Sequence, residues 1–162
     1  MTASDLRTPL IGVLVGGGIA ATLDLVYAIL RQAGFGGSPL WTLQSVASGW
    51  LGEGAFTSGA LGGVIGLVSH YGILLVAAAI YLAASKRVHI LQTHALASGA
   101  LFGVLVYLFM NFVVLPLSAF PYPLSYPPLR LLEGFVSHAI FVGIPIALAI
   151  RRSAPIEPRP AS

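Results

Sequence analysis

The sequence predicts an all-α, polytopic membrane protein with four transmembrane helices and one short interfacial helix. Its 162 residues are 57% hydrophobic and only 8% charged, whereas soluble globular domains carry about 25% charged residues. The apolar residues are gathered into four runs, each long enough to cross a bilayer, which takes about 20 residues. A surface with so little charge suits lipid rather than water, so the lipid bilayer is the first expected partner.

The predicted spans cover residues 10–30, 60–82, 94–117 and 129–150. Glycines follow the first span, and paired basic residues follow the second and the fourth. The spans and their connections form a single transmembrane domain over residues 1–152. Residues 153–162 are polar and rich in proline, and we expect them to form a disordered cytoplasmic tail.

A short amphipathic helix is predicted over residues 39–51. Ser38 is a good helix cap, a proline follows it, and apolar residues then recur at helical spacing. We expect this helix to lie at the membrane interface with Trp41 and Trp50 as anchors. A re-entrant helix that lines a cavity is the alternative interpretation.

The distribution of basic residues predicts the orientation. Four spans place both termini on one side of the membrane. That side carries six basic residues, namely Arg7, Lys86, Arg87, Arg151, Arg152 and Arg159. The opposite side carries only Arg31 and Arg130. The positive-inside rule therefore places both termini in the cytoplasm of a multi-pass protein of the bacterial inner (plasma) membrane.

A repeated sequence motif occurs in the second and the fourth span. Residues 66–70 read GLVSH and residues 134–138 read GFVSH, so a histidine follows nearly the same lead twice. The first and third spans share a weaker pattern of spaced glycines followed by a polar residue. We interpret the chain as two helical hairpins that are parallel repeats, related by an axis along the membrane normal.

Spaced glycines mark the expected helix contacts. Lipid supplies no hydrophobic drive between helices, so close backbone packing must hold them together. The predicted packing residues are Gly12, Gly16, Gly99 and Gly103.

Polar side chains inside the spans are the candidate functional residues. They are Asp24, His70, Asn111, Glu133 and His138. The two histidines are expected near the membrane midplane, with the other three in a layer closer to the outer face. An aspartate at the centre of a span costs about 2.5–3.5 kcal/mol, so these groups should face the helix bundle.

Three interpretations of this polar layer remain open. In the first, the groups hydrogen-bond one another and specify the packing of a non-enzymatic accessory or scaffold subunit, or of a small stand-alone module. Its partners would be other membrane subunits or further copies of the chain. In the second, the layer carries protons or a small solute across the membrane. In the third, His70 and His138 ligate the iron of a haem b.

Several functions are not expected. The basic residues are too few and too scattered for nucleic-acid binding. The chain has no cysteine, which excludes disulfides and thiolate metal sites. No nucleophile–base pair or metal-binding helix motif is present in the sequence, so we predict neither an enzyme nor a metal site, and no cofactor apart from the haem alternative.

Three features over residues 60–152 resemble the YagU-like family of bacterial inner-membrane proteins. They are His70 in the second span, residues 111–116 (NFVVLP) at the end of the third, and His138 leading to Arg151 and Arg152 in the fourth. The resemblance implies a multi-span inner-membrane protein and assigns no chemistry to it.

Overall fold

The structure is a computed structural model that describes the backbone of residues 3–153 and the side chains of residues 9–153. The described residues form helices joined by turns and loops, with no strand among them. In chain order the elements are α1 (Ala3–Ala33), α2 (Pro39–Leu51), α3 (Gly54–Thr57), α4 (Ala60–Ser85), α5 (Ile90–Thr93), α6 (Ala95–Phe109), the π-helical segment η1 (Met110–Val114), α7 (Leu115–Leu117), α8 (Pro128–His138), the π-helical segment η2 (Ala139–Gly143) and α9 (Ile144–Ser153). The prediction of an all-α protein is confirmed for these residues.

Four helical stretches are long and apolar enough to cross a membrane, namely Pro9–Ala33, Ala60–Ser85, Ala95–Leu117 and Pro128–Ser153. The first extends past the predicted end at residue 30 because Gly36, at a positive φ of 81°, makes the closing turn. The predicted tail begins inside α9, because Ser153 is helical. Its remaining residues, 154–162, lie outside the described part of the chain.

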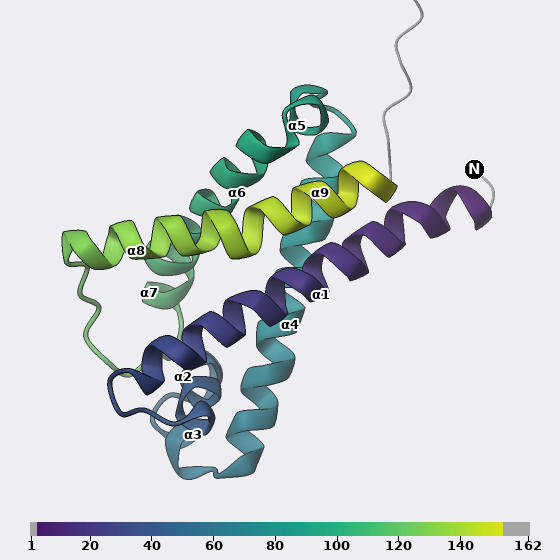
Figure 1. The fold of residues 1–162 in the computed structure, drawn as a ribbon. Coiled ribbons are helices and arrows are strands. Elements are labelled where there is room, and N and C mark those ends of the chain that lie inside the picture. The colour runs from purple at the N-terminus through teal and green to yellow at the C-terminus, as the bar shows by residue number, and fades with distance from the viewer. Residues whose placement is uncertain (1–2, 154–162) are drawn as a thin grey trace, which may run out of the picture.

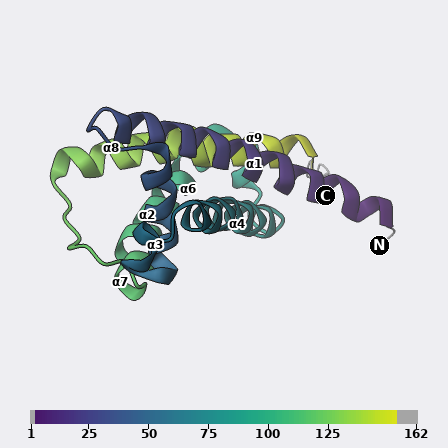
Figure 2. The same ribbon diagram turned by 90° about the horizontal axis from the view of Figure 1, so that it is seen from below.

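The long helices form two layers. Helix α1 lies beside η2 and α9, and α4 and α6 pack on one side of that pair (Figures 1 and 2). The N-terminal end of α1, the C-terminal end of α9 and α5 lie at one end of the molecule, which we call the terminal end. Helices α2 and α3 and the connection from α7 to α8 lie at the opposite end, the loop end (Figure 1).

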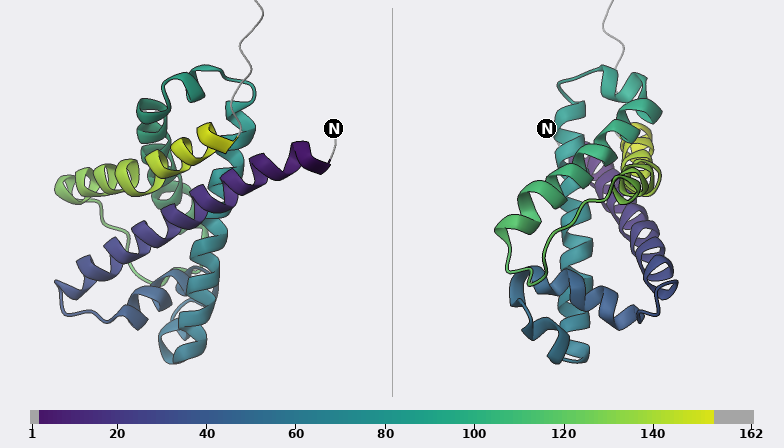
Figure 3. Two further views of the ribbon diagram at one scale, coloured as in Figure 1. Left: turned by 45° about the vertical axis from the view of Figure 1, so that its right-hand side comes forward. Right: turned by 90° about the vertical axis from the view of Figure 1, so that its left-hand side faces the viewer.

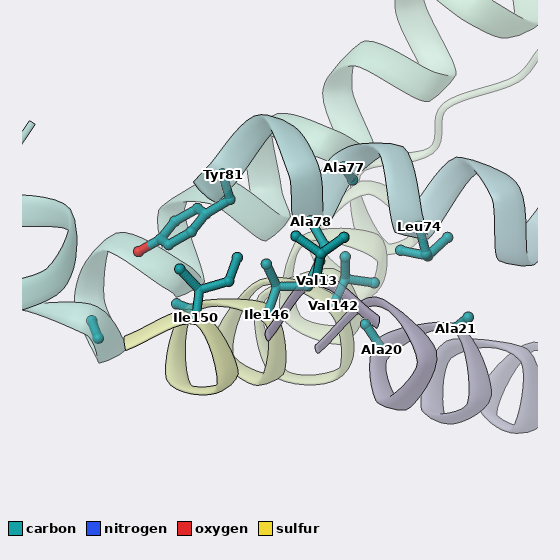
Figure 4. Close-up of a cluster of buried hydrophobic side chains, with 12 residues drawn as sticks. Val13, Ala20, Ala21, Leu74, Ala77, Ala78, Tyr81, Val142, Ile146 and Ile150 are labelled. Carbon is teal, nitrogen blue, oxygen red and sulfur yellow. The ribbon is translucent and has the colours of Figure 1, made fainter. Parts of the chain in front are cut away.

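The apolar core lies in the half of the molecule nearer the terminal end. It joins α1, α4 and the η2–α9 stretch, and Tyr81, Ile146 and Ile150 are its largest fully buried side chains (Figure 4). Tyr81 also brings α4 to α6, because its ring packs on Phe102 with centroids 5.1 Å apart. The hydroxyl of Tyr81 donates to the carbonyl oxygen of Leu91 at 2.7 Å. This half of the molecule is therefore tightly closed.

The predicted packing glycines all face α8, η2 or α9. A Cβ atom at Gly12 would meet Ser153, and one at Gly16 would meet Ile146 and Ala149. From the other layer, Gly99 approaches Gly143, Ile144 and Ala147, and Gly103 approaches the backbone of His138 and Ala139. Both glycine pairs thus seat α1 and α6 against the same C-terminal helix, which small residues allow to approach closely.

The helix predicted over residues 39–51 is α2, with those bounds. It packs on the first part of α4 (Figure 3). A Cβ atom at Gly66 of α4 would collide with the carbonyl group of Leu43. The indole nitrogen of Trp50 donates to the hydroxyl oxygen of Ser69 at 3.2 Å. Because Ser69 is the tenth residue of α4, α2 lies alongside a candidate span and not beyond its end.

Two π-helical turns interrupt the third and fourth stretches. Leu115 N–H donates to the carbonyl oxygen of Met110, and Ile144 N–H donates to that of Ala139, five residues back in each case. A proline directly follows each donor, at Pro116 and Pro145. A proline ring clashes with the carbonyl four residues earlier, and widening the turn relieves that clash.

Candidate functional site

An ion pair closes the loop end of the polar site. The Nε and Nη2 atoms of Arg31 donate to Oε1 and Oε2 of Glu133 at 2.5 and 3.0 Å. The hydroxyl of Tyr27 donates to Oε1 of the same carboxylate at 2.7 Å. Glu133 is therefore held by α1 on two sides, and a bidentate pair of this kind fixes geometry as well as charge.

Asp24 and His138 face each other about two turns deeper. His138 Nδ1 lies 4.0 Å from Asp24 Oδ1, which is too long for a hydrogen bond. Instead Nδ1 lies 3.4 Å from the hydroxyl of Ser137, and the imidazole ring packs edge-on against Tyr107 with centroids 5.0 Å apart. Within the described part of the chain the carboxylate of Asp24 has no hydrogen-bond partner, and its oxygens are not fully buried.

His70 is engaged differently from His138. Its Nε2 lies 2.9 Å from the carbonyl oxygen of Ala21. A carbonyl only accepts, so Nε2 carries a proton. The two histidines with matching lead sequences thus have different partners, because His70 bonds to the backbone of α1 whereas His138 faces an acidic side chain of the same helix.

Asn111 turns back on its own helix. Its Nδ2 donates to the carbonyl oxygen of Tyr107 at 2.9 Å, and its own carbonyl accepts a hydrogen bond from the hydroxyl of Tyr126. The ring of Tyr126 stacks on Phe112, with centroids 4.5 Å apart. Asn111 thereby ties the proline-rich connection to the end of the third stretch.

Two cavities bring all five predicted residues together. A polar cavity of 360 Å³ at the loop end is lined by Glu133, Asn111, His138 and others, including Arg31. A larger cavity of 740 Å³ is lined by Asp24, His70 and His138 together with many apolar side chains. His138 lines both, so the two cavities adjoin at this residue.

The larger cavity separates α4 from α6. Its walls come from Ile73 and Leu74 of α4 and from Val106 and Phe109 of α6, and η1 continues the second wall. Helix α2 and residues 115–120 border it at the loop end. Toward the terminal end it stops at Leu74 and Val142, which belong to the core (Figure 4).

The polar residues form two layers, whereas the sequence predicted that Asp24 would lie above the histidines. At 1.5 Å per residue, Asp24, His70 and His138 each lie about 14–15 Å from the loop end of their helix. Asn111 and Glu133 lie about 8–9 Å from it. Asp24 is deeper than expected because α1 continues to Ala33.

Arg31, Tyr27 and Tyr107 also belong to the site, although they were not predicted from the sequence. In the prediction from sequence, Arg31 was considered only as a basic residue on the outer side of the membrane. Tyr27 and Arg31 follow Asp24 by three and seven residues, so the three share one face of α1. That spacing was a usable signal, whereas nothing in the sequence pairs Arg31 with Glu133.

The geometry bears on which cofactors the histidines could hold. Within residues 9–153, no group of three or more His, Cys, Asp or Glu side chains is arranged to hold a metal ion. Nε2 of His70 already donates to Ala21, so ligating a haem iron through that atom would require breaking this bond. Haem ligation through this atom would therefore have to replace the contact between His70 and α1.

No protein-family model matches this chain, and neither a curated protein nor a solved structure matches it.

Proposed function

We propose that this chain is a non-enzymatic integral membrane protein that binds a small solute in the cavity between α4 and α6. The observation that supports this most directly is the cavity itself. Its 740 Å³ falls within the range of about 300–1,000 Å³ of ligand sites, and such sites combine apolar walls with a few converging polar groups. Asp24, His70 and His138 supply those groups at mid-depth in their helices.

The cavity also supports a direction of access. It is bordered at the loop end by α2, and toward the terminal end the core closes it. With both termini in the cytoplasm, as the basic residues favour, the solute would enter from the outer side. Passage across the membrane would then require the helices of the core to separate. The π-helical turns beside the cavity are irregular, and such turns are frequent at functional sites.

In this proposal α2 is a re-entrant helix and not an interfacial one. The bond between Trp50 and Ser69 and the close approach at Gly66 support this position beside α4. Polar side chains of α2, among them Gln44 and Ser48, are buried, whereas Leu40 and Leu51 are exposed. A buried polar face and an exposed apolar face suit a helix with lipid on one side and the other helices on the other.

The test exploits the absence of cysteine in the chain. A cysteine in place of Ser45, which lines the cavity, should react with iodoacetamide added in water to protein in nanodiscs. A matched cysteine in place of Leu101, which is 61% exposed on α6 and lines neither of the two cavities, should face lipid and react much more slowly. Equal, slow reaction at both positions would contradict an accessible cavity.

An accessory subunit is the second candidate, and the packing of α6 favours it. Each of the four stretches contains an apolar segment of 18 residues. In the third stretch only 6% of the residues of that segment are buried, whereas in the other three the buried share is 28–33%. Such a helix has an apolar face free for a further membrane subunit or a second copy. Mass measurement of the protein extracted in mild detergent would reveal a partner, whereas a lone chain would contradict this role.

A further inference from the structure

The carboxylate of Asp24 is the least satisfied charge in the larger cavity. Its side chain is only 14% exposed, yet within the described residues the closest group that can carry a positive charge is His138, at 4.0 Å. His70 directs its Nε2–H to the backbone of α1, so that proton is not available to Asp24. Asp24 is half-buried and its oxygens are not fully enclosed, but a carboxylate that is largely removed from water and has no fixed partner is costly unless a ligand or a proton completes it.

The fixed cation nearest along α1 does not complete it. Arg31, seven residues further along the helix, is bound to both oxygens of Glu133. The two charges of that pair cancel, and the pair lines the smaller cavity and not the larger one. When both histidines are neutral, the lining of the larger cavity therefore carries one negative charge, that of Asp24, and no positive charge.

The rest of the cavity suits an apolar body. Apart from the three titratable groups and two serines, its lining is apolar or glycine. Three aromatic side chains are included, namely Trp50, Phe109 and Phe120. Aromatic faces attract cations as well as apolar groups, so the same walls serve both parts of a lipophilic cation.

We infer that the solute is a lipophilic organic cation, such as an amine or onium compound with an apolar body, whose charge is paired with Asp24. This inference rests on the proposed function and adds the chemical class of the solute. An anionic solute of the same size would face the carboxylate without a compensating cation. A neutral solute could donate hydrogen bonds to Asp24 but would leave its negative charge uncompensated.

The experiment compares two probes of nearly equal shape and opposite charge, tetraphenylphosphonium and tetraphenylborate. Binding is measured by equilibrium dialysis of the full chain in phosphatidylcholine nanodiscs, with empty nanodiscs as the blank. We expect saturable binding of tetraphenylphosphonium and none of tetraphenylborate. Asp24→Asn should weaken phosphonium binding about ten- to hundredfold, because the Coulomb attraction between the carboxylate and the phosphonium is lost.

Two further variants keep the test decisive if Asp24→Asn folds poorly. Asp24→Glu keeps the charge and should retain phosphonium binding to within about tenfold. Ser45→Phe adds an aromatic ring to the wall of the cavity, leaves Asp24 in place, and should weaken that binding at least about tenfold. Circular dichroism and thermal unfolding establish that each variant is folded.

The outcomes separate this inference from the proposed function. Borate binding as tight as phosphonium binding, or phosphonium binding unaffected by Asp24→Asn, would overturn the cation assignment and leave a solute site in place. Binding of neither probe, with a reactive cysteine at position 45, would also overturn only the cation assignment. Binding of neither probe together with an unreactive cysteine at that position would overturn both.

Discussion

Arg31 and Glu133, 102 residues apart in the chain, form a bidentate ion pair that joins α1 to α8 at the loop end of the polar site. Tyr27 completes the arrangement from the same helix as Arg31. This pair fixes the relative position of the two helices that carry Asp24 and His138. It is therefore the structural support on which the mid-depth site depends.

Removing the cation should destabilise the fold measurably. Arg31→Gln leaves Glu133 without its partner, and we expect the free energy of unfolding to fall by about 1–2 kcal/mol, since both side chains remain partly exposed. Thermal or denaturant unfolding in detergent measures this change. The double variant Arg31→Gln/Glu133→Gln should lose less than the sum of the two single variants.

Arg130 offers a matched control for that experiment. It is exposed and its guanidinium stacks on Phe35, with 5.8 Å between its Cζ atom and the ring centroid. Arg130→Gln should change the stability by no more than about 0.5 kcal/mol. Equal effects of Arg31→Gln and Arg130→Gln would contradict a structural role for the ion pair.

The contact between α2 and α4 should depend on the absence of a side chain at one position. Gly66→Ala places a methyl group against the carbonyl of Leu43, and overpacking of this kind costs about 1–3 kcal/mol. We also expect the fluorescence of Trp50 to change, because its bond to Ser69 holds α2 in place.

Gly72 in the same helix is the control for Gly66. A Cβ atom there would meet nothing within 4 Å, so Gly72→Ala should be neutral, or stabilising by up to about 1 kcal/mol through helix propensity. If the Gly72→Ala variant had a lower free energy of unfolding than the Gly66→Ala variant, α2 would not pack on α4 as described.

The histidines should bind no haem. The protein purified from haem-replete cells should be colourless, because Nε2 of His70 is engaged by Ala21. His70→Ala should then lower the free energy of unfolding by about 0.6 kcal/mol, the average for an intramembrane hydrogen bond. A Soret band that is lost on substitution of either histidine would establish the haem interpretation instead.

The orientation can be tested by labelling. A cysteine in place of Ser125, in the exposed connection from α7 to α8, should react with an impermeant reagent applied to intact spheroplasts. A cysteine in place of His89, which is exposed at the terminal end, should react only in inverted vesicles. The reverse pattern would place the termini outside, and labelling of both positions in spheroplasts would refute the four-span topology.

The sequence by itself determined the four long helical stretches and α2, whereas α3, α5 and the π-helical segments were not predicted. Long apolar runs with few charges form helices because every backbone polar group must be satisfied without water. The breaks at glycines and prolines were equally local, which is why α2 was predicted with its observed bounds. The same reasoning identified the five polar residues, because the cost of placing them in lipid depends only on their own chemistry.

Tertiary structure decided what those residues meet. The sequence contains no signal that pairs Arg31 with Glu133 or that gives His70 a backbone partner while His138 faces Asp24. Each arrangement depends on the rotation and offset of helices far apart in the chain, which close glycine contacts set. The cavity between α4 and α6 also depends on tertiary structure. Tyr81 and Phe102 join the two helices near the terminal end. Toward the loop end the helices are apart, and α2 borders the space between them.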